Sequence, residues 1–151
     1  MTHLVGQIVD AMKAALIGLP TTGSNVFDGE PRQLGEGDLP ALVIEEGDDR
    51  ATPASRLYPR IIGHTQNFTV FAVVKAKDPA SVRRQIRLEV ERALATAGPN
   101  LGGAQKLTKD IRPAGASAPR SDYDSETPVS ILGISFEVDY QHVETTPDVA
   151  Y

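Results

Sequence analysis

Two long segments of the sequence alternate between apolar and polar residues, and this period of two predicts a pair of β-strands. Segment 129–143 has one apolar and one polar face, which is typical of a strand with one side in the core and the other in water. Its apolar face consists of Leu132, Ile134, Phe136, Val138 and Tyr140. Segment 64–77 has an apolar face and a mixed face that includes Thr69 and Lys75, and its length and β-branched residues predict a central strand.

Two other segments carry apolar residues at helical spacing and predict helices near 4–18 and 79–96. The first ends at Gly18. The second has Asp78 as its N-cap with a proline directly after it, and a Gly-Pro pair ends it. Each helix has a single apolar stripe, so we expect both to cover the same face of a sheet.

Shorter apolar runs predict the remaining strands. The run at 41–46 is apolar enough to be covered on both faces, whereas 26–27 is too short to be more than an edge strand or bridge. Segment 111–117 contains a proline and a glycine, which suits another edge strand. The predicted fold is therefore one α+β domain over 1–151. It has a mixed or mostly antiparallel sheet with two helices packed on one face.

Two polar stretches predict long loops, at about 47–62 and 118–128, and the tail after residue 143 is expected to be loose. Proline and charged residues dominate both loops, so neither can stabilise itself. We expect them to be mobile in the free subunit and to become ordered against a partner. The candidate interface residues are Asp48, Asp49, Arg50, Arg56, Arg60, Arg120, Asp122 and Tyr123.

Composition limits the possible functions. The chain of 151 residues has a formal charge of −5, which argues against a nucleic-acid binder that works by counterion release. It has no cysteine, so disulfides, thiol catalysis and cysteine-ligated metals are excluded. No apolar run reaches the roughly 18 residues of a membrane span, and the first residues lack the pattern of a signal peptide. We therefore expect a cytoplasmic chain with no membrane partner.

No residue pattern points to chemistry. The three histidines, His3, His64 and His142, have no metal-ligand spacing and are interpreted as surface or strand-end residues. The acidic run 45–49 lacks the alternation of a calcium loop and is interpreted as a solvated loop. The close glycine pairs form no phosphate-binding motif, and no serine has the context of a nucleophile. The sequence predicts no catalytic residue, no metal and no cofactor, and hence no enzyme.

The order and spacing of several segments resemble phage tail terminator and tail-completion proteins of long-tailed phages. The resemblance covers most of the chain. It rests on the N-terminal amphipathic helix, TTGSNVF at 21–27, LPALVI at 39–44, FTVFAVV at 68–74, the Asp78-Pro79 helix start and ISFEVDY at 134–140. It implies a small subunit without catalytic residues that forms a six-fold ring in the virion tail, assembled in the host cytoplasm.

The resemblance also implies partners. The ring would contact the tail tube protein, end its polymerisation and offer a surface to head–tail connector or neck proteins, while DNA only passes through the channel. Two alternatives stay open. One is another neck or head-completion protein of the same particle. The other is a small α+β enzyme or ligand-binding domain, which would need a pocket with convergent polar groups and titratable residues of perturbed pKa.

Overall fold

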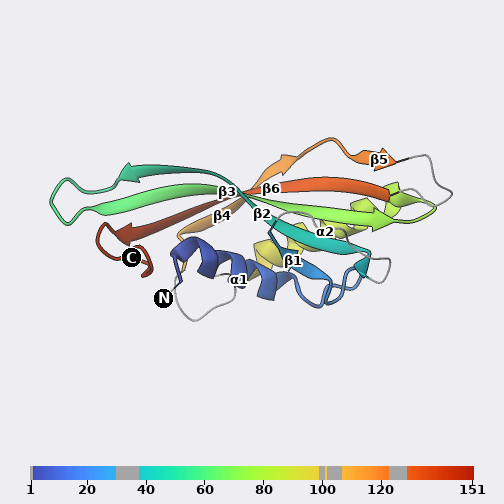
Figure 1. Ribbon diagram of the computed structural model, residues 1–151, viewed down its shortest axis with the longest axis horizontal. Helices are drawn as coiled ribbons and strands as arrows, with labels where there is room; N and C mark the ends of the chain where they lie inside the picture. The colour runs from blue at the N-terminus through green and yellow to red at the C-terminus, as the bar shows by residue number, and fades with distance from the viewer. Residues whose placement is uncertain (1, 30–37, 99–100, 102–106, 123–128) are drawn as a thin grey trace.

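The computed structural model describes residues 2–29, 38–98, 101, 107–122 and 129–151. Its elements in chain order are α1 (Leu4–Leu16), β1 (Val26–Asp28), β2 (Ala41–Pro53), β3 (Ile61–Lys75), α2 (Pro79–Ala97), β4 (Asp110–Ala116), β5 (Arg120–Asp122) and β6 (Val129–Val143). The strands form one six-stranded sheet in the order β1-β2-β3-β6-β4, and β5 pairs with β6 beyond the end of β4. Only β1 and β2 run parallel. The prediction of a single α+β domain with a mixed, mostly antiparallel sheet is confirmed (Figure 1).

Both helices lie on the same face of the sheet, as predicted (Figure 1). The register places Phe68 of β3 opposite Phe136 of β6, and Val70 lies between Ile44 and Ile134. All five side chains are at most 2% exposed. Because alternate residues of each strand point to the same face, these rows meet the apolar stripes of α1 and α2 and form one core.

The helix boundaries follow from their caps. α1 starts after His3, whose Nδ1 accepts a hydrogen bond from the Val5 amide at 3.1 Å, and it ends two residues earlier than predicted. α2 has the predicted N-cap, since the Asp78 carboxylate accepts from the Ser81 amide. Gly98, with φ of 66°, ends α2 in a conformation that favours glycine.

The predicted loop at 47–62 is wrong for most of its length. β2 continues to Pro53 and β3 already begins at Ile61, so the two strands form a long hairpin closed by residues 54–60. The distal part of β2 is exposed, and its backbone pairs with β3 although its side chains do not alternate between apolar and polar. The polar composition that suggested a loop therefore belongs to a solvated strand.

Two smaller expectations also change. Within the predicted loop 118–128, Arg120–Asp122 form β5, and residues 123–128 lie outside the described part of the chain. The tail is not loose, because it folds back on β6. His142 and Ala150 form a β-bridge, and the Tyr151 amide donates to the Gln141 carbonyl at 2.9 Å. Backbone pairing thus compensates for the polar side chains of the tail.

Candidate functional site

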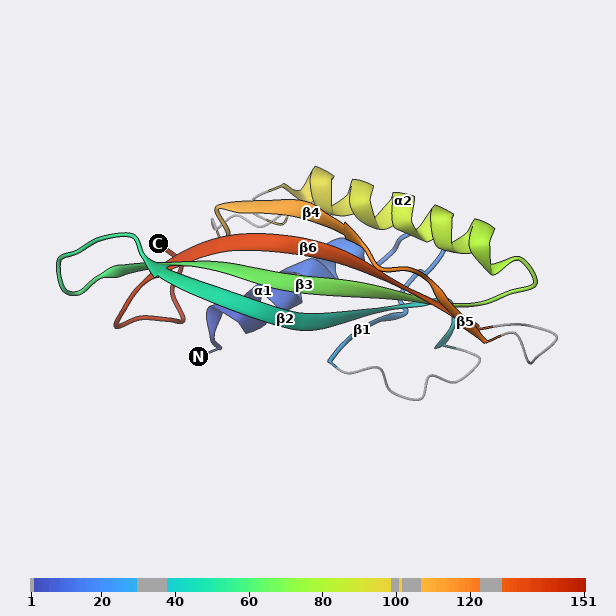
Figure 2. The same ribbon diagram turned by 90° about the horizontal axis from the view of Figure 1, so that it is seen from above.

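The distal part of the β2–β3 hairpin forms an arm that extends past both helices (Figures 1 and 2). The arm comprises residues 47–66. A β-bulge at its base shifts the register between Glu46 and Asp49. The Gln66 amide nitrogen donates to the Gly47 carbonyl at 2.7 Å and so satisfies a backbone group that the bulge takes out of the ladder. β6 runs beside β3 as far as Val143, so most of the arm is a three-stranded sheet.

The tip of the arm, residues 54–60, presents apolar side chains to solvent. Leu57 is 83% exposed and Tyr58 is 76% exposed. The turn itself is held by the Ala54 amide, which donates to the Ile61 carbonyl at 2.7 Å. Large apolar side chains this exposed at the end of a protruding element are typical of a contact site for another protein.

An ion pair ties the arm to the segment after β6. The Arg60 guanidinium donates two hydrogen bonds to the Glu144 carboxylate, at 2.7 and 3.1 Å. This hydrogen bonding raises the pKa of Arg60 and lowers the pKa of Glu144. Both side chains face solvent, so the pair orients the end of the turn more than it stabilises the fold.

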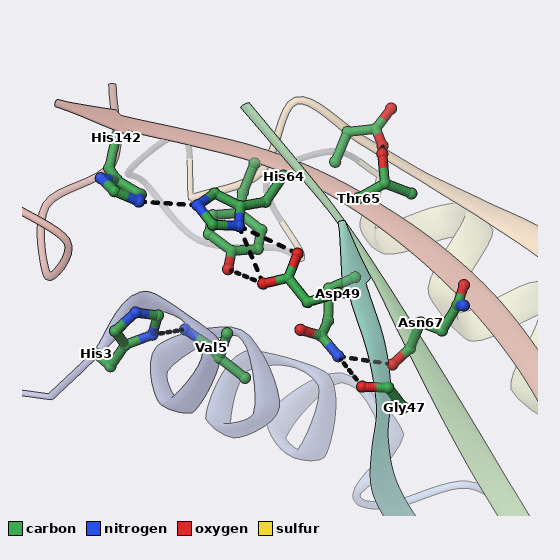
Figure 3. Close-up of polar contacts among 11 residues, drawn as sticks. His3, Val5, Gly47, Asp49, His64, Thr65, Asn67 and His142 are labelled. Atoms are coloured by element: carbon green, nitrogen blue, oxygen red, sulfur yellow. Dashed lines mark hydrogen bonds and ion pairs between the residues drawn. The ribbon is translucent and has the colours of Figure 1, made fainter. Parts of the chain in front are cut away.

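A cluster of polar rings lies at the base of the arm, on the same face as α1 (Figure 3). The Asp49 carboxylate accepts from Nδ1 of His64 at 3.0 Å and from the Tyr140 hydroxyl at 3.2 Å. The rings of His64 and Tyr140 are stacked with centroids 4.6 Å apart. On the other side, Nε2 of His64 lies 2.9 Å from Nε2 of His142. Strands β2, β3 and β6 each contribute to this cluster.

Hydrogen-bond partners fix the orientation of the two histidine rings. Nδ1 of His142 lies 2.8 Å from the Val143 carbonyl, which can only accept, so that nitrogen carries a hydrogen. Nδ1 of His64 likewise donates to Asp49. The two Nε2 atoms then face each other, and their contact is a hydrogen bond only when one of them is protonated.

The interpretation of the histidines as surface or strand-end residues is corrected in part. His142 does lie near the end of β6, but it is only 7% exposed. His64 belongs to the arm and His3 caps α1. Burial raises the pKa of Tyr140, and the nearby Asp49 charge raises it further, so the hydroxyl stays a donor. The cluster is suited to holding three strands together.

A second charged cluster lies on the opposite face of the sheet. The Arg112 guanidinium binds the carboxylates of Asp139 at 2.7 Å, Glu137 at 2.8 Å and Asp110 at 3.1 Å. These hydrogen bonds raise the pKa of Arg112, and the bond from Arg112 lowers the pKa of Asp139. The cluster joins β4 to β6 across exposed positions.

The structure separates the predicted interface residues into two groups at opposite ends of the molecule (Figure 2). The arm carries Asp48, Asp49, Arg50, Arg56 and Arg60. Asp49 faces the polar cluster, so it is a structural residue more than a contact residue. Arg120 and Asp122 belong to β5 at the other end, and Tyr123 lies outside the described residues.

Sequence reasoning missed the apolar tip and both polar clusters. The Leu57-Tyr58 pair stands between two arginines, and this pattern is a local signal that was available. The His64–His142 contact joins residues 78 positions apart, so no local pattern could reveal it.

Within the described ranges, no group of histidine and carboxylate side chains is arranged to hold a metal ion. Neither of the two helices has the length and apolar character that crossing a membrane requires.

Comparisons with known proteins give a limited result. No protein-family model matches the sequence, and no curated protein matches it either. Among solved structures, the chain is similar to a chain of the virion of a native gene transfer agent particle. The sequence identity is 19% over 91% of this chain and 92% of that chain, with a TM-score of 0.47. At this identity and TM-score, the likeness establishes neither a family nor a function.

Proposed function

We propose that this chain is a structural subunit of a phage-like virion. In this role it forms a ring, hexameric by resemblance, on the last ring of the tail tube. The ring ends tube polymerisation and gives head–tail connector or neck proteins a surface to join. The segments that resemble tail terminators, at 21–27, 39–44, 68–74 and 134–140, support the proposal. The likeness to a gene transfer agent virion chain points the same way, but the proposal does not depend on it.

The observation that carries the proposal is the arm. Its tip leaves Leu57 and Tyr58 in water at the end of a stiff three-stranded extension. A subunit that works alone gains nothing from such an element, whereas an assembly subunit uses it to reach a neighbour. Arg50 and Arg56 on the arm, and Arg120 on β5, are the proposed contact residues with the ring neighbour, the tube or the connector.

Deleting the gene tests the role. Tails of uncontrolled length that fail to join heads are the expected result, because the ring both stops the tube and supports the head. Tails of normal length without heads would favour another neck or head-completion protein. Infectious particles of normal form would overturn both structural roles and leave the ligand-binding alternative.

A further inference from the structure

The distal arm has a charge opposite to that of the rest of the molecule. Residues 50–63 contain Arg50, Arg56 and Arg60 and no carboxylate, although the whole chain carries −5. Arg60 is paired with Glu144. Within the described part of the chain, Arg50 and Arg56 have no hydrogen-bond or ion-pair partner. The tip therefore presents one free cation, Arg56, next to the exposed Leu57 and Tyr58, while Arg50 lies nearer the base of the arm, opposite Thr65 in the ladder.

A groove of the opposite charge lies between α1 and the edge of the sheet. It has a volume of about 540 Å³, and its apolar lining includes Val9. Among the described residues, four carboxylates line it and no lysine or arginine does: Asp10, Asp28, Glu45 and Glu46. β1 pairs with β2 only as far as Ile44, so the groove opens where the outer edge of β2 has no neighbouring strand among the described residues.

The tip cannot reach the groove of its own molecule. β3 pairs with β6 through Ile61 and Val143, which holds the arm straight almost to its turn. The tip lies at one extreme of the long axis, beyond both helices (Figures 1 and 2). The groove is instead lined mainly by residues of α1, β1 and the proximal part of β2. A second copy of the chain supplies both the complementary charge and the required distance.

We propose that the arm tip of one copy docks in the acidic groove of the next. Arg56 of one copy meets Asp10 and Glu46 of its neighbour, and Leu57 and Tyr58 leave water against the groove. The contact joins two different surfaces, so it is head-to-tail and closes into a ring when the rotation between copies allows. This inference rests on the proposed ring and names the surfaces that would form it.

Complementary charge variants test the contact by sedimentation at low and moderate salt. The tip variant is Arg56→Glu, and the groove variant is Asp10→Lys with Glu46→Lys. Wild-type chain should self-associate, more weakly as salt rises. Each variant alone should associate at least about tenfold more weakly, because every contact then places like charges together. A 1:1 mixture should regain association, starting with dimers, because both contacts between unlike variants pair opposite charges: the native tip with the native groove, and the reversed tip with the reversed groove.

A matched control reverses two exposed arginines of α2, Arg84→Glu with Arg92→Glu, and should associate like wild type. Thermal unfolding checks that each variant is folded. If a charge variant misfolds, Leu57→Ser with Tyr58→Ser provides a second tip variant. A monomeric wild type overturns the inference, as does wild-type-like association of the folded tip variant or a mixture without dimers.

The absence of cysteine permits a direct measurement. A chain with Tyr58→Cys, mixed with a chain carrying Glu46→Cys, should form a disulfide-linked heterodimer under oxidation. Arg84→Cys in place of Glu46→Cys should not. Equal cross-linking of both pairs would overturn the docking. If these tests fail but deletion of the gene still gives overlong tails, the proposed function stands and only the two named docking surfaces are wrong.

Discussion

Replacing Asp49 by alanine should destabilise the fold far more than the replacement of a residue in a solvated loop, which is how the sequence pattern is interpreted at this position. The Asp49 carboxylate is the partner of the His64 ring and the Tyr140 hydroxyl. A hydrogen bond to a charged group contributes about 1.5–3 kcal/mol, and a buried donor left alone costs a comparable amount. The Asp49 side chain is 32% exposed, so water replaces part of the loss. The expected decrease in the free energy of unfolding is about 2–3 kcal/mol.

Urea and thermal unfolding of the wild type and four variants measure this effect. For a chain of this size the melting temperature should fall by about 4–12 °C. The matched control is Asp48→Ala. Asp48 directly precedes Asp49 in β2 and is exposed, so the free energy of unfolding should change by no more than about 0.5 kcal/mol. Tyr140→Phe alone should cost about 1 kcal/mol. The double variant, Asp49→Ala with Tyr140→Phe, should lose less stability than the sum of the two single losses. Asp49→Ala leaves the Tyr140 hydroxyl without a partner, and in the double variant that hydroxyl is absent. Equal stability of the two alanine variants would refute the assignment of Asp49 to the cluster.

Three further predictions concern the core, the outer face and acid stability. Phe68→Ala should cost about 3–5 kcal/mol in urea unfolding, since the ring is fully buried and faces Phe136. Gly133→Ala should cost about 1–3 kcal/mol, because a Cβ there would lie 2.8 Å from Oγ of Ser117. The pKa of Asp139 is lowered in the folded state from its ordinary value of 3.8. The Asp139 carboxylate therefore contributes its full share to the stability of the fold above pH 3.8, and this share is lost as the pH falls through the lower pKa of the folded state. Asp139→Asn should therefore lose less stability than wild type between about pH 4 and pH 2.

Side-chain periodicity allowed most of the body of the molecule to be predicted. β3 and β6 each bury one full row of apolar side chains, and both helices have a single stripe with a recognisable end. In these elements the side-chain pattern and the backbone structure have the same cause, which is burial against one core. The arm has no such core on either face, so the predicted strand at 41–46 stopped where β2 extends past the helices.

The polar cluster could not be predicted for a second reason, which is the bulge at Gly47. Glu46 pairs with Phe68, and an unbroken ladder would next place Asp48 opposite Gln66. The extra residue places Asp49 there instead, on the face of His64 and Tyr140. A shift of one residue exchanges the two faces of a strand, so the sequence alone offered two adjacent aspartates with no means to choose between them.

The charge distribution would favour the proposed contacts between copies over contacts within one chain. The distal arm has three arginines and no carboxylate, so the rest of the chain is more acidic than the formal −5 indicates. Two bodies repel each other at long range, and the only attractive approach presents the arm of one copy to the body of another. This orients the encounter before any apolar contact forms. The same acidic body would repel DNA in a channel, which is compatible with passage and unfavourable to binding. A single asymmetry in charge thus serves both parts of the proposed role.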